Sequence, residues 1–147
     1  MNISLNENVR VVQKDEILFK EGQSPTHLII VKSGGILCLK RSKERLVPVM
    51  WGSDQNIIGE EAVLSGSEHG YSAVVMEESE IVEIDANEIK RTMSSAPAWI
   101  SGFLATLGER ANDTASAIAE HRIGHAKLSG GQELAPQEET RLKKLLI

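Results

Sequence analysis

The chain has 147 residues, 25% of them charged, and a formal net charge of −5 at pH 7. This length is typical of one domain with its own hydrophobic core, and the acidic balance provides no global positive field to attract nucleic acid or an anionic membrane. The polar start and the lack of any run of roughly 18 apolar residues predict a cytoplasmic protein without a membrane span. The single cysteine, Cys38, lies in an alternating apolar run and is expected to be a small buried side chain.

Short apolar runs alternate with turn signals from Val9 to about Ile84. Runs such as HLIIVKS and GILCLKR are separated by segments rich in Gly, Ser and Pro, such as EGQSP and SGSEHG. Regular short strands between such segments are typical of an antiparallel sandwich or roll.

Residues 59–73 carry the most specific pattern, GEEAVLSGSEHGYSA. The segment resembles the phosphate-binding cassette of cyclic-nucleotide-binding domains, in which Gly-Glu precedes a short apolar helical turn, a variable loop, an Arg, a small residue and an Ala. Four residues match this pattern, namely Gly59, Glu60, Ser72 and Ala73. Tyr71 stands where the Arg is expected.

The resemblance implies an α+β fold: a jelly-roll-like antiparallel β-roll, flanked by short helices and followed by a long C-terminal dimerisation helix. It implies a ligand pocket inside the roll, in which backbone N–H groups and a forked cation hold a cyclic phosphate and an acidic residue accepts a bond from the ribose hydroxyl. The residues that it assigns to ligand binding are Gly59, Glu60, Glu61, Ala62, Tyr71, Ser72, Ala73 and Thr114.

Tyr71 leaves two hypotheses open. Replacing a charge-assisted bond by a neutral one costs about ten- to a hundredfold in affinity, and within the cassette only His69 is able to carry positive charge. The preceding hairpin supplies Arg41, Lys43 and Arg45. We therefore expect a non-enzymatic regulatory domain with a degenerate cassette that acts through a protein partner. The alternative is a functional receptor for a cyclic nucleotide or cyclic dinucleotide that uses a non-standard pocket.

A helical regime follows the strands. Asp85 is a predicted N-cap, and Pro97 suits the first turn of a long helix that extends to about Leu128. Positions in steps of four and three form a heptad seam and predict a homodimer interface; they are Ile100, Leu104, Leu107, Ala111, Thr114, Ile118, His121 and His125. Gly102 and Gly108 permit close helix approach, and Phe103, off the seam, is expected to pack on the roll. His121 and His125 suit the negative end of the helix dipole better than a metal site.

The remaining features give a division into residues 1–96 (roll with short helices), 97–128 (long helix) and 129–147 (linker and short amphipathic helix from Pro136). No P-loop, GxSxG elbow, CxxC or HExxH motif occurs, so we expect no enzyme and no metal or other cofactor. A helix-turn-helix does not fit into residues 129–147, so no DNA binding is predicted. The last helix is expected to fold back on the roll or the dimer, with a partner-docking peptide as the alternative.

Overall fold

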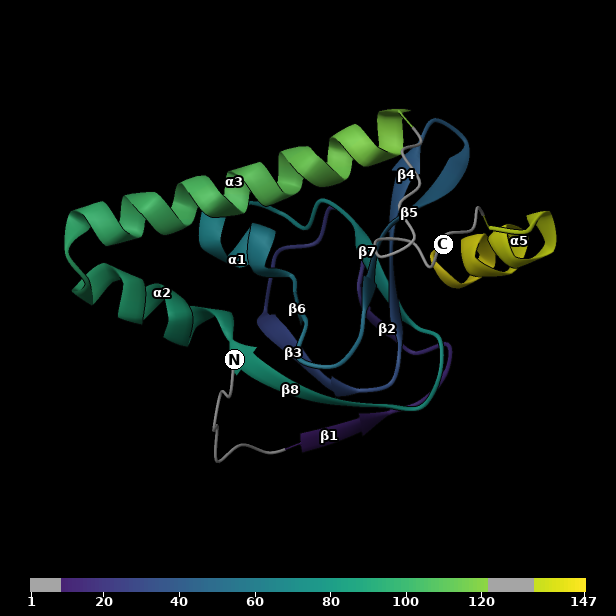
Figure 1. Ribbon diagram of the computed structural model, residues 1–147, viewed down its shortest axis with the longest axis horizontal. Helices are drawn as coiled ribbons and strands as arrows, with labels where there is room; N and C mark the ends of the chain where they lie inside the picture. Colours follow the sequence, from purple (N-terminus) through teal and green to yellow (C-terminus); the bar gives the residue numbers. More distant parts are fainter. Residues whose placement is uncertain (1–8, 122–133) are drawn as a thin grey trace.

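The computed structural model describes residues 9–121 and 134–147, and in them the chain forms two four-stranded antiparallel sheets and helices (Figure 1). The first sheet has the order β1 (Val9–Val12), β8 (Ser79–Asp85), β3 (His27–Ser33) and β6 (Ile57–Ile58). The second has the order β2 (Ile17–Phe19), β7 (Ser72–Val75), β4 (Ile36–Ser42) and β5 (Arg45–Gly52). The predicted α+β roll is confirmed.

Side chains alternate between the two faces of each strand, and both sheets bury most of both faces; β1 is the exception, because Val9 and Val11 are 49% and 53% exposed. In β3, Ile29 and Val31 face the interior of the roll, whereas Leu28 and Ile30 belong to a separate outer cluster. Cys38 lies fully buried in the interior, as predicted, and burial raises the pKa of its thiol well above the usual range. The roll therefore has an inner core and an apolar outer layer on each side.

Four helices cover these layers within the described residues: α1 (Glu60–Ser65), α2 (Ala86–Ser95), α3 (Ala98–His121) and α5 (Pro136–Leu145). The predicted N-cap is confirmed, since the Asp85 carboxylate accepts bonds from the N–H groups of Asn87 at 2.7 Å and Glu88 at 3.2 Å. In Figure 1, α3 runs across α1, and α5 lies beside the second sheet. None of these helices is long and apolar enough to cross a lipid bilayer.

The C-terminal half of α3 closes the roll. Ala115, Ile118 and Ala119 are buried and belong to the inner core. Phe103, by contrast, is 58% exposed, so the prediction that it packs on the roll is wrong. The helix is rotated so that Trp99, Phe103 and Leu107, which are 73%, 58% and 40% exposed, share an outward face. We call these three residues the apolar stripe.

Gly108 brings α3 into close contact with α1. A Cβ atom at Gly108 would lie 2.8 Å from the Ser65 amide nitrogen and 3.1 Å from the Glu61 carbonyl oxygen. Gly102, about 1.7 turns earlier, has no atom of the described residues within 4 Å of such an atom. The close approach that Gly108 permits is therefore used inside the chain, against α1.

Helix α5 packs on the outer face of the second sheet, where Leu142 and Leu146 join Leu37, Leu39, Leu46 and Val74 in one cluster. Glu139 anchors it: the buried carboxylate accepts bonds from Arg45 Nε at 2.8 Å and from the Leu46 N–H at 2.9 Å. Ile147, the residue after Leu146, is 91% exposed. The tail helix thus folds back on its own roll.

Candidate functional site: the cassette at residues 59–73

The cassette starts at the end of β6, where the chain turns into α1. Gly59 has φ +82°, a left-handed conformation that side-chain-bearing residues rarely adopt. A Cβ atom there would also lie 3.2 Å from His69 Cε1 and 3.4 Å from a ring carbon of Phe19. Glycine is therefore required both by the backbone and by the side chains that pack on it.

Tyr71 closes the start of α1 from inside. Its side chain is buried, with 4% exposure, and its hydroxyl oxygen accepts a bond from the Gly59 N–H at 3.1 Å. Burial, reinforced by the nearby acidic groups, raises the pKa of Tyr71 well above the usual range, so the phenol stays neutral. The amide that would be offered to a phosphate is thus bonded to the residue that replaces the arginine.

A second aromatic contact fills the same region. The ring of His69 stacks on Phe19, with centroids 3.7 Å apart and planes 10° apart, and Phe19 also lies against Tyr71 with centroids 5.7 Å apart. His69 Nδ1 lies 3.2 Å from Glu61 Oε1, to which the Gly70 N–H also donates at 3.4 Å. His69 is 3% exposed, and its polar contact is therefore with a carboxylate of the cassette itself.

Three buried acceptor atoms have no hydrogen-bond partner in the described part of the chain: Glu60 Oε2, Glu61 Oε2 and Asn112 Oδ1. Burial raises the pKa of Glu60 to about 7, and the charge of Glu61 adds to this effect. All three oxygen atoms are able to accept hydrogen bonds. The cassette therefore has room for a hydrogen-bond donor, and it places acidic groups, of which Glu60 is partly protonated near pH 7, where an anion would have to approach.

The structure brings together only part of the predicted ligand-binding set. Gly59, Glu60, Glu61 and Tyr71 converge at the start of α1, and Ala62 and Ala73 are fully buried in the packing around it. Ser72 is on the opposite side of β7 from Ala73, and its Oγ accepts a bond from the Glu21 N–H at 2.9 Å.

Thr114 is exposed and bonds the Arg110 carbonyl oxygen of its own helix at 2.8 Å. The α3 residue that does reach the cassette is Asn112, which sits against Gly70. Helical periodicity places Asn112 and Ala115 on one face of α3 and Thr114 on another. Which of these faces contacts the cassette depends on where α3 crosses α1, and the sequence does not give that crossing point. The stacking of Phe19 on His69 has no signal in the sequence, because the two residues belong to distant segments.

The predicted dimer interface is divided between faces. Ile118 is buried in the roll; Ile100, Leu104 and Ala111 are half-buried; Leu107, Thr114 and His121 are exposed; and His125 lies outside the described residues. Among residues 9–121 and 134–147, no group of three or more His, Cys, Asp or Glu side chains is arranged to hold a metal ion.

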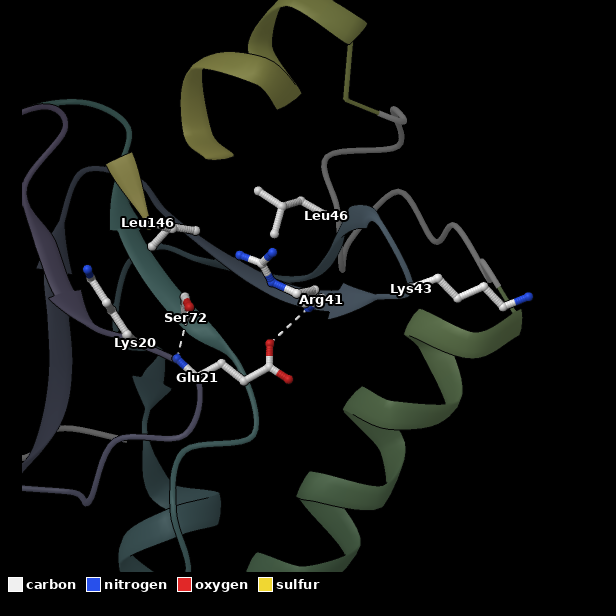
Figure 2. Close-up of a pocket in the computed structure, with 7 residues that line it drawn as sticks. All are labelled: Lys20, Glu21, Arg41, Lys43, Leu46, Ser72 and Leu146. Atoms are coloured by element: carbon white, nitrogen blue, oxygen red, sulfur yellow. Dashed lines mark hydrogen bonds between the residues drawn. The ribbon is translucent and has the colours of Figure 1, made fainter. Parts of the chain in front are cut away.

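The cations of the β4–β5 hairpin lie outside the roll. Arg41 and Lys43 line a hollow on the outer face of the second sheet (Figure 2). Arg45 is bonded to Glu139 of α5. The charge missing at position 71 is therefore not supplied by these three side chains.

Comparison with known proteins agrees with the fold. The family model described as cyclic nucleotide-binding domain matches residues 9–96, which is more than half of the chain. No curated protein sequence matches. The EAL enzyme Bd1971 in its cAMP-bound form is similar in structure, with a TM-score of 0.66 and 19% identity over 78% of this chain, and the chain spans 31% of that enzyme.

With two smaller solved proteins, the aligned part is a large share of both chains. A cyclic nucleotide-binding-like protein from Brucella abortus has a TM-score of 0.51 and 25% identity over 60% of this chain and 77% of its own. A putative cyclic nucleotide-binding protein from Geobacter metallireducens has a TM-score of 0.56 and 15% identity over 79% of this chain and 78% of its own. The family model and the fold of the similar structures agree, and the chain belongs to the cyclic nucleotide-binding domain family.

Proposed function

We propose that the chain is a non-enzymatic regulatory domain whose phosphate cassette is closed by Tyr71, and that it acts through a protein partner. The observation that carries this proposal is the bond from the Gly59 N–H to the Tyr71 hydroxyl oxygen, at 3.1 Å. A cyclic phosphate would have to displace that buried hydroxyl and would gain no cation in return. Because the pocket is closed from inside, a partner protein would bind the outer surface of the domain.

The charges around the cassette support the same conclusion. A cyclic phosphate is an anion, and its site must supply donors or positive charge. Here Glu60 and Glu61 supply acceptors, and His69 is directed at Glu61. The residues present do not fit the phosphate of an ordinary cyclic mononucleotide.

Calorimetric titration with cyclic AMP, cyclic GMP and cyclic di-GMP tests the proposal. We expect no binding by the wild-type chain at micromolar concentrations. In the Tyr71→Arg variant the guanidinium replaces the phenol and has Glu60 and Glu61 to balance its charge, so we expect at least about a tenfold gain in affinity for a cyclic mononucleotide.

Tyr71→Phe is the matched control. It removes only the hydroxyl and frees the Gly59 N–H without adding charge, so it should gain much less than Tyr71→Arg. Micromolar or tighter binding by the wild-type chain would reject the closed cassette if the ligand sits in the roll. A substitution of Glu60 should then abolish the binding heat, whereas a substitution outside the roll should leave it unchanged.

A receptor with a non-standard pocket is the second candidate, and one observation favours it. Glu60 Oε2 is buried, has no hydrogen-bond partner among the residues that the structure describes, and is able to accept a bond from a ribose hydroxyl. The structure of the EAL enzyme Bd1971 is described with both cAMP and cyclic di-GMP bound, and this chain covers 30% of that protein at 18% identity. The same titrations decide between the two candidates.

We also propose that the chain forms a homodimer through the apolar stripe. Trp99, Phe103 and Leu107 are spaced by four residues, face outward together and remain 73%, 58% and 40% exposed. Large apolar side chains gathered on one helix face are typical of an interface with another chain, and a helix that pairs with its own copy gives a closed two-fold assembly. Of the predicted heptad seam, Leu107 belongs to this proposed interface, whereas the buried seam residues do not.

A further inference from the structure

A hollow of about 450 Å³ lies outside the roll, between the second sheet and the end of α5. Figure 2 shows that its lining comes from segments far apart in sequence, with Lys20 on one side, Arg41 above the Glu21 carboxylate on the other, and Leu146 from the tail, while the Lys43 ammonium extends away from these side chains. We call it the outer hollow. Its volume is within the range of sites for small ligands, about 300–1,000 Å³.

Positive charge is in excess in the outer hollow. Its one carboxylate, Glu21, is already satisfied: Oε1 accepts from Lys40 Nζ at 3.1 Å and Oε2 from the Arg41 N–H at 2.9 Å. The charged groups of Lys20, Arg41 and Lys43 have no side-chain carboxylate within 4.0 Å among the described residues. Lys20 Nζ already donates to the Ile147 main-chain oxygen at 3.1 Å, so Arg41 is the cation directed into the hollow that has no carboxylate partner among the described residues, in a chain whose net charge is −5.

Ser72 adds a neutral donor at the base of the hollow. The residue is 6% exposed, and its Oγ accepts the Glu21 N–H at 2.9 Å, which leaves the hydroxyl proton to be donated elsewhere. Figure 2 shows the Ser72 hydroxyl among the lining side chains. It faces outward because β7 alternates, with Ala73 in the inner core and Val74 in the outer cluster.

We propose that the outer hollow binds a small phosphate-bearing anion. The forked guanidinium of Arg41 is suited to two phosphate oxygens, the ammonium group of Lys20 supplies a point charge from the other side, and Ser72 donates one neutral bond. Leu46 and Leu146 form an apolar wall that suits an organic group attached to the phosphate. This site is separate from the interior of the roll, where Tyr71 lies.

Anion binding here is linked to the docking of α5. Leu146 is part of both the outer hollow and the apolar cluster that holds α5, and Lys20 Nζ donates to the Ile147 carbonyl oxygen at 3.1 Å. A ligand that binds only when α5 is docked stabilises the docked state by mass action. The occupied hollow therefore holds the tail helix on the roll.

Calorimetric titration of the full chain with inorganic pyrophosphate, in phosphate-free buffer at low salt, tests the site. We expect saturable one-to-one binding that falls by about ten- to a hundredfold in Arg41→Gln, because one charge-assisted contact is lost. Lys90→Gln is the matched control: it removes one positive charge beside a different hollow, between α1, α2 and α3, and should bind as the wild type does. Absence of saturable binding, or equal weakening by both substitutions, would overturn the proposal.

Two further arms complete the experiment. AMP should bind more tightly than inorganic phosphate if the leucine wall contacts an organic group, whereas equal affinities assign the site to the inorganic anion. Hydrogen exchange of the α5 amides should slow on addition of pyrophosphate in the wild type and not in Arg41→Gln. Unchanged exchange in the wild type at saturating pyrophosphate would remove the link to α5. Because Arg41 is outside the cassette, these results are distinguishable from those of Tyr71→Arg.

Discussion

Tyr71, which stands where the family pattern has an arginine, leaves the neighbouring carboxyl groups of Glu60 and Glu61 without a nearby positive charge. An arginine at this position would balance Glu60 and Glu61 inside the roll, and without it each carboxylate has an oxygen with no partner in the described residues. Burial then raises the pKa of Glu60 to about 7. Between about pH 4.5 and pH 7, the folded state therefore keeps a proton on Glu60 that the unfolded chain has released.

A pH dependence follows for Glu60. Its pKa is raised from the usual 4.5 to about 7, so its protonated form favours folding below about pH 4.5, and this contribution is lost as pH rises through 7. The shift corresponds to about 3 kcal/mol in the free energy of unfolding. We expect Glu60→Gln, measured by urea unfolding, to match the wild type at pH 4 and to exceed its stability by roughly that amount at pH 8.

Glu80→Gln is the control for the loss of one negative charge, because Glu80 is an exposed residue of β8. It should leave the pH profile of unfolding close to that of the wild type. A parallel profile for Glu60→Gln and the wild type across pH 4 to 8 would contradict a buried, titrating Glu60.

Residue-level prediction from the sequence succeeded where a motif fixes the position. The departure at Tyr71 is readable because Gly59, Ser72 and Ala73 define the frame of the cassette. The consequence of that departure is not readable, since the stacking of Phe19 on His69 joins segments that no local periodicity connects.

Helix α3 shows what periodicity leaves undetermined at the scale of an element. Steps of three and four residues describe both a seam toward a second helix and a stripe that covers a roll, and the two differ by a small rotation of the helix. The structure resolves the rotation: Ile118 faces the inner core, and Trp99 and Phe103 face outward. The predicted helix is correct within the described range, but its buried face was partly misassigned. The contact of Gly108 with α1 fixes the rotation of α3, and α1 has only six residues, too few for a periodic pattern to reveal that contact.

Two glycines of α3 are expected to respond to alanine with opposite signs. Gly108→Ala places a methyl group 2.8 Å from the α1 backbone and should lower the free energy of unfolding by about 1–3 kcal/mol. The methyl group of Gly102→Ala has no described atom within 4 Å, so this substitution should raise the free energy of unfolding by about 0.5–1 kcal/mol, because alanine favours the helix. Urea titration of both variants gives the comparison, and shifts of the same sign would show that α3 does not rest on α1 as described.

At the scale of the whole molecule, the layers that cover most of both sheets leave a large apolar feature on α3 outside the packing of the described residues, in addition to the exposed Val9 and Val11 of β1. Helices α1 and α2 contribute to the outer cluster of the first sheet, α5 covers that of the second, and the end of α3 closes the inner core. The apolar stripe is not used by any of these layers. The sequence predicted the roll, its helices and the returning tail, because alternation, caps and Pro136 are local signals.

Phe103→Asp tests the proposed homodimer. A carboxylate in the apolar stripe would be buried without a partner on association, so sedimentation at tens of micromolar should show a shift from dimer to monomer. Val11→Asp is the matched control, because Val11 is 53% exposed on β1, away from α3. A wild-type chain that sediments as a monomer at this concentration, or an equal shift for both variants, would refute the stripe as the interface.

The four residues of β7 separate two regions of the molecule. Ala73 and Val75 line the interior beside Tyr71, whereas Ser72 and Val74 line the outer hollow and the α5 cluster. A shift of one residue in a strand exchanges its two faces. During evolutionary divergence, substitutions at single positions of β7 are therefore tolerable one face at a time, but a one-residue insertion or deletion would disrupt both sites together. Homologues should vary in composition along this strand and keep its length.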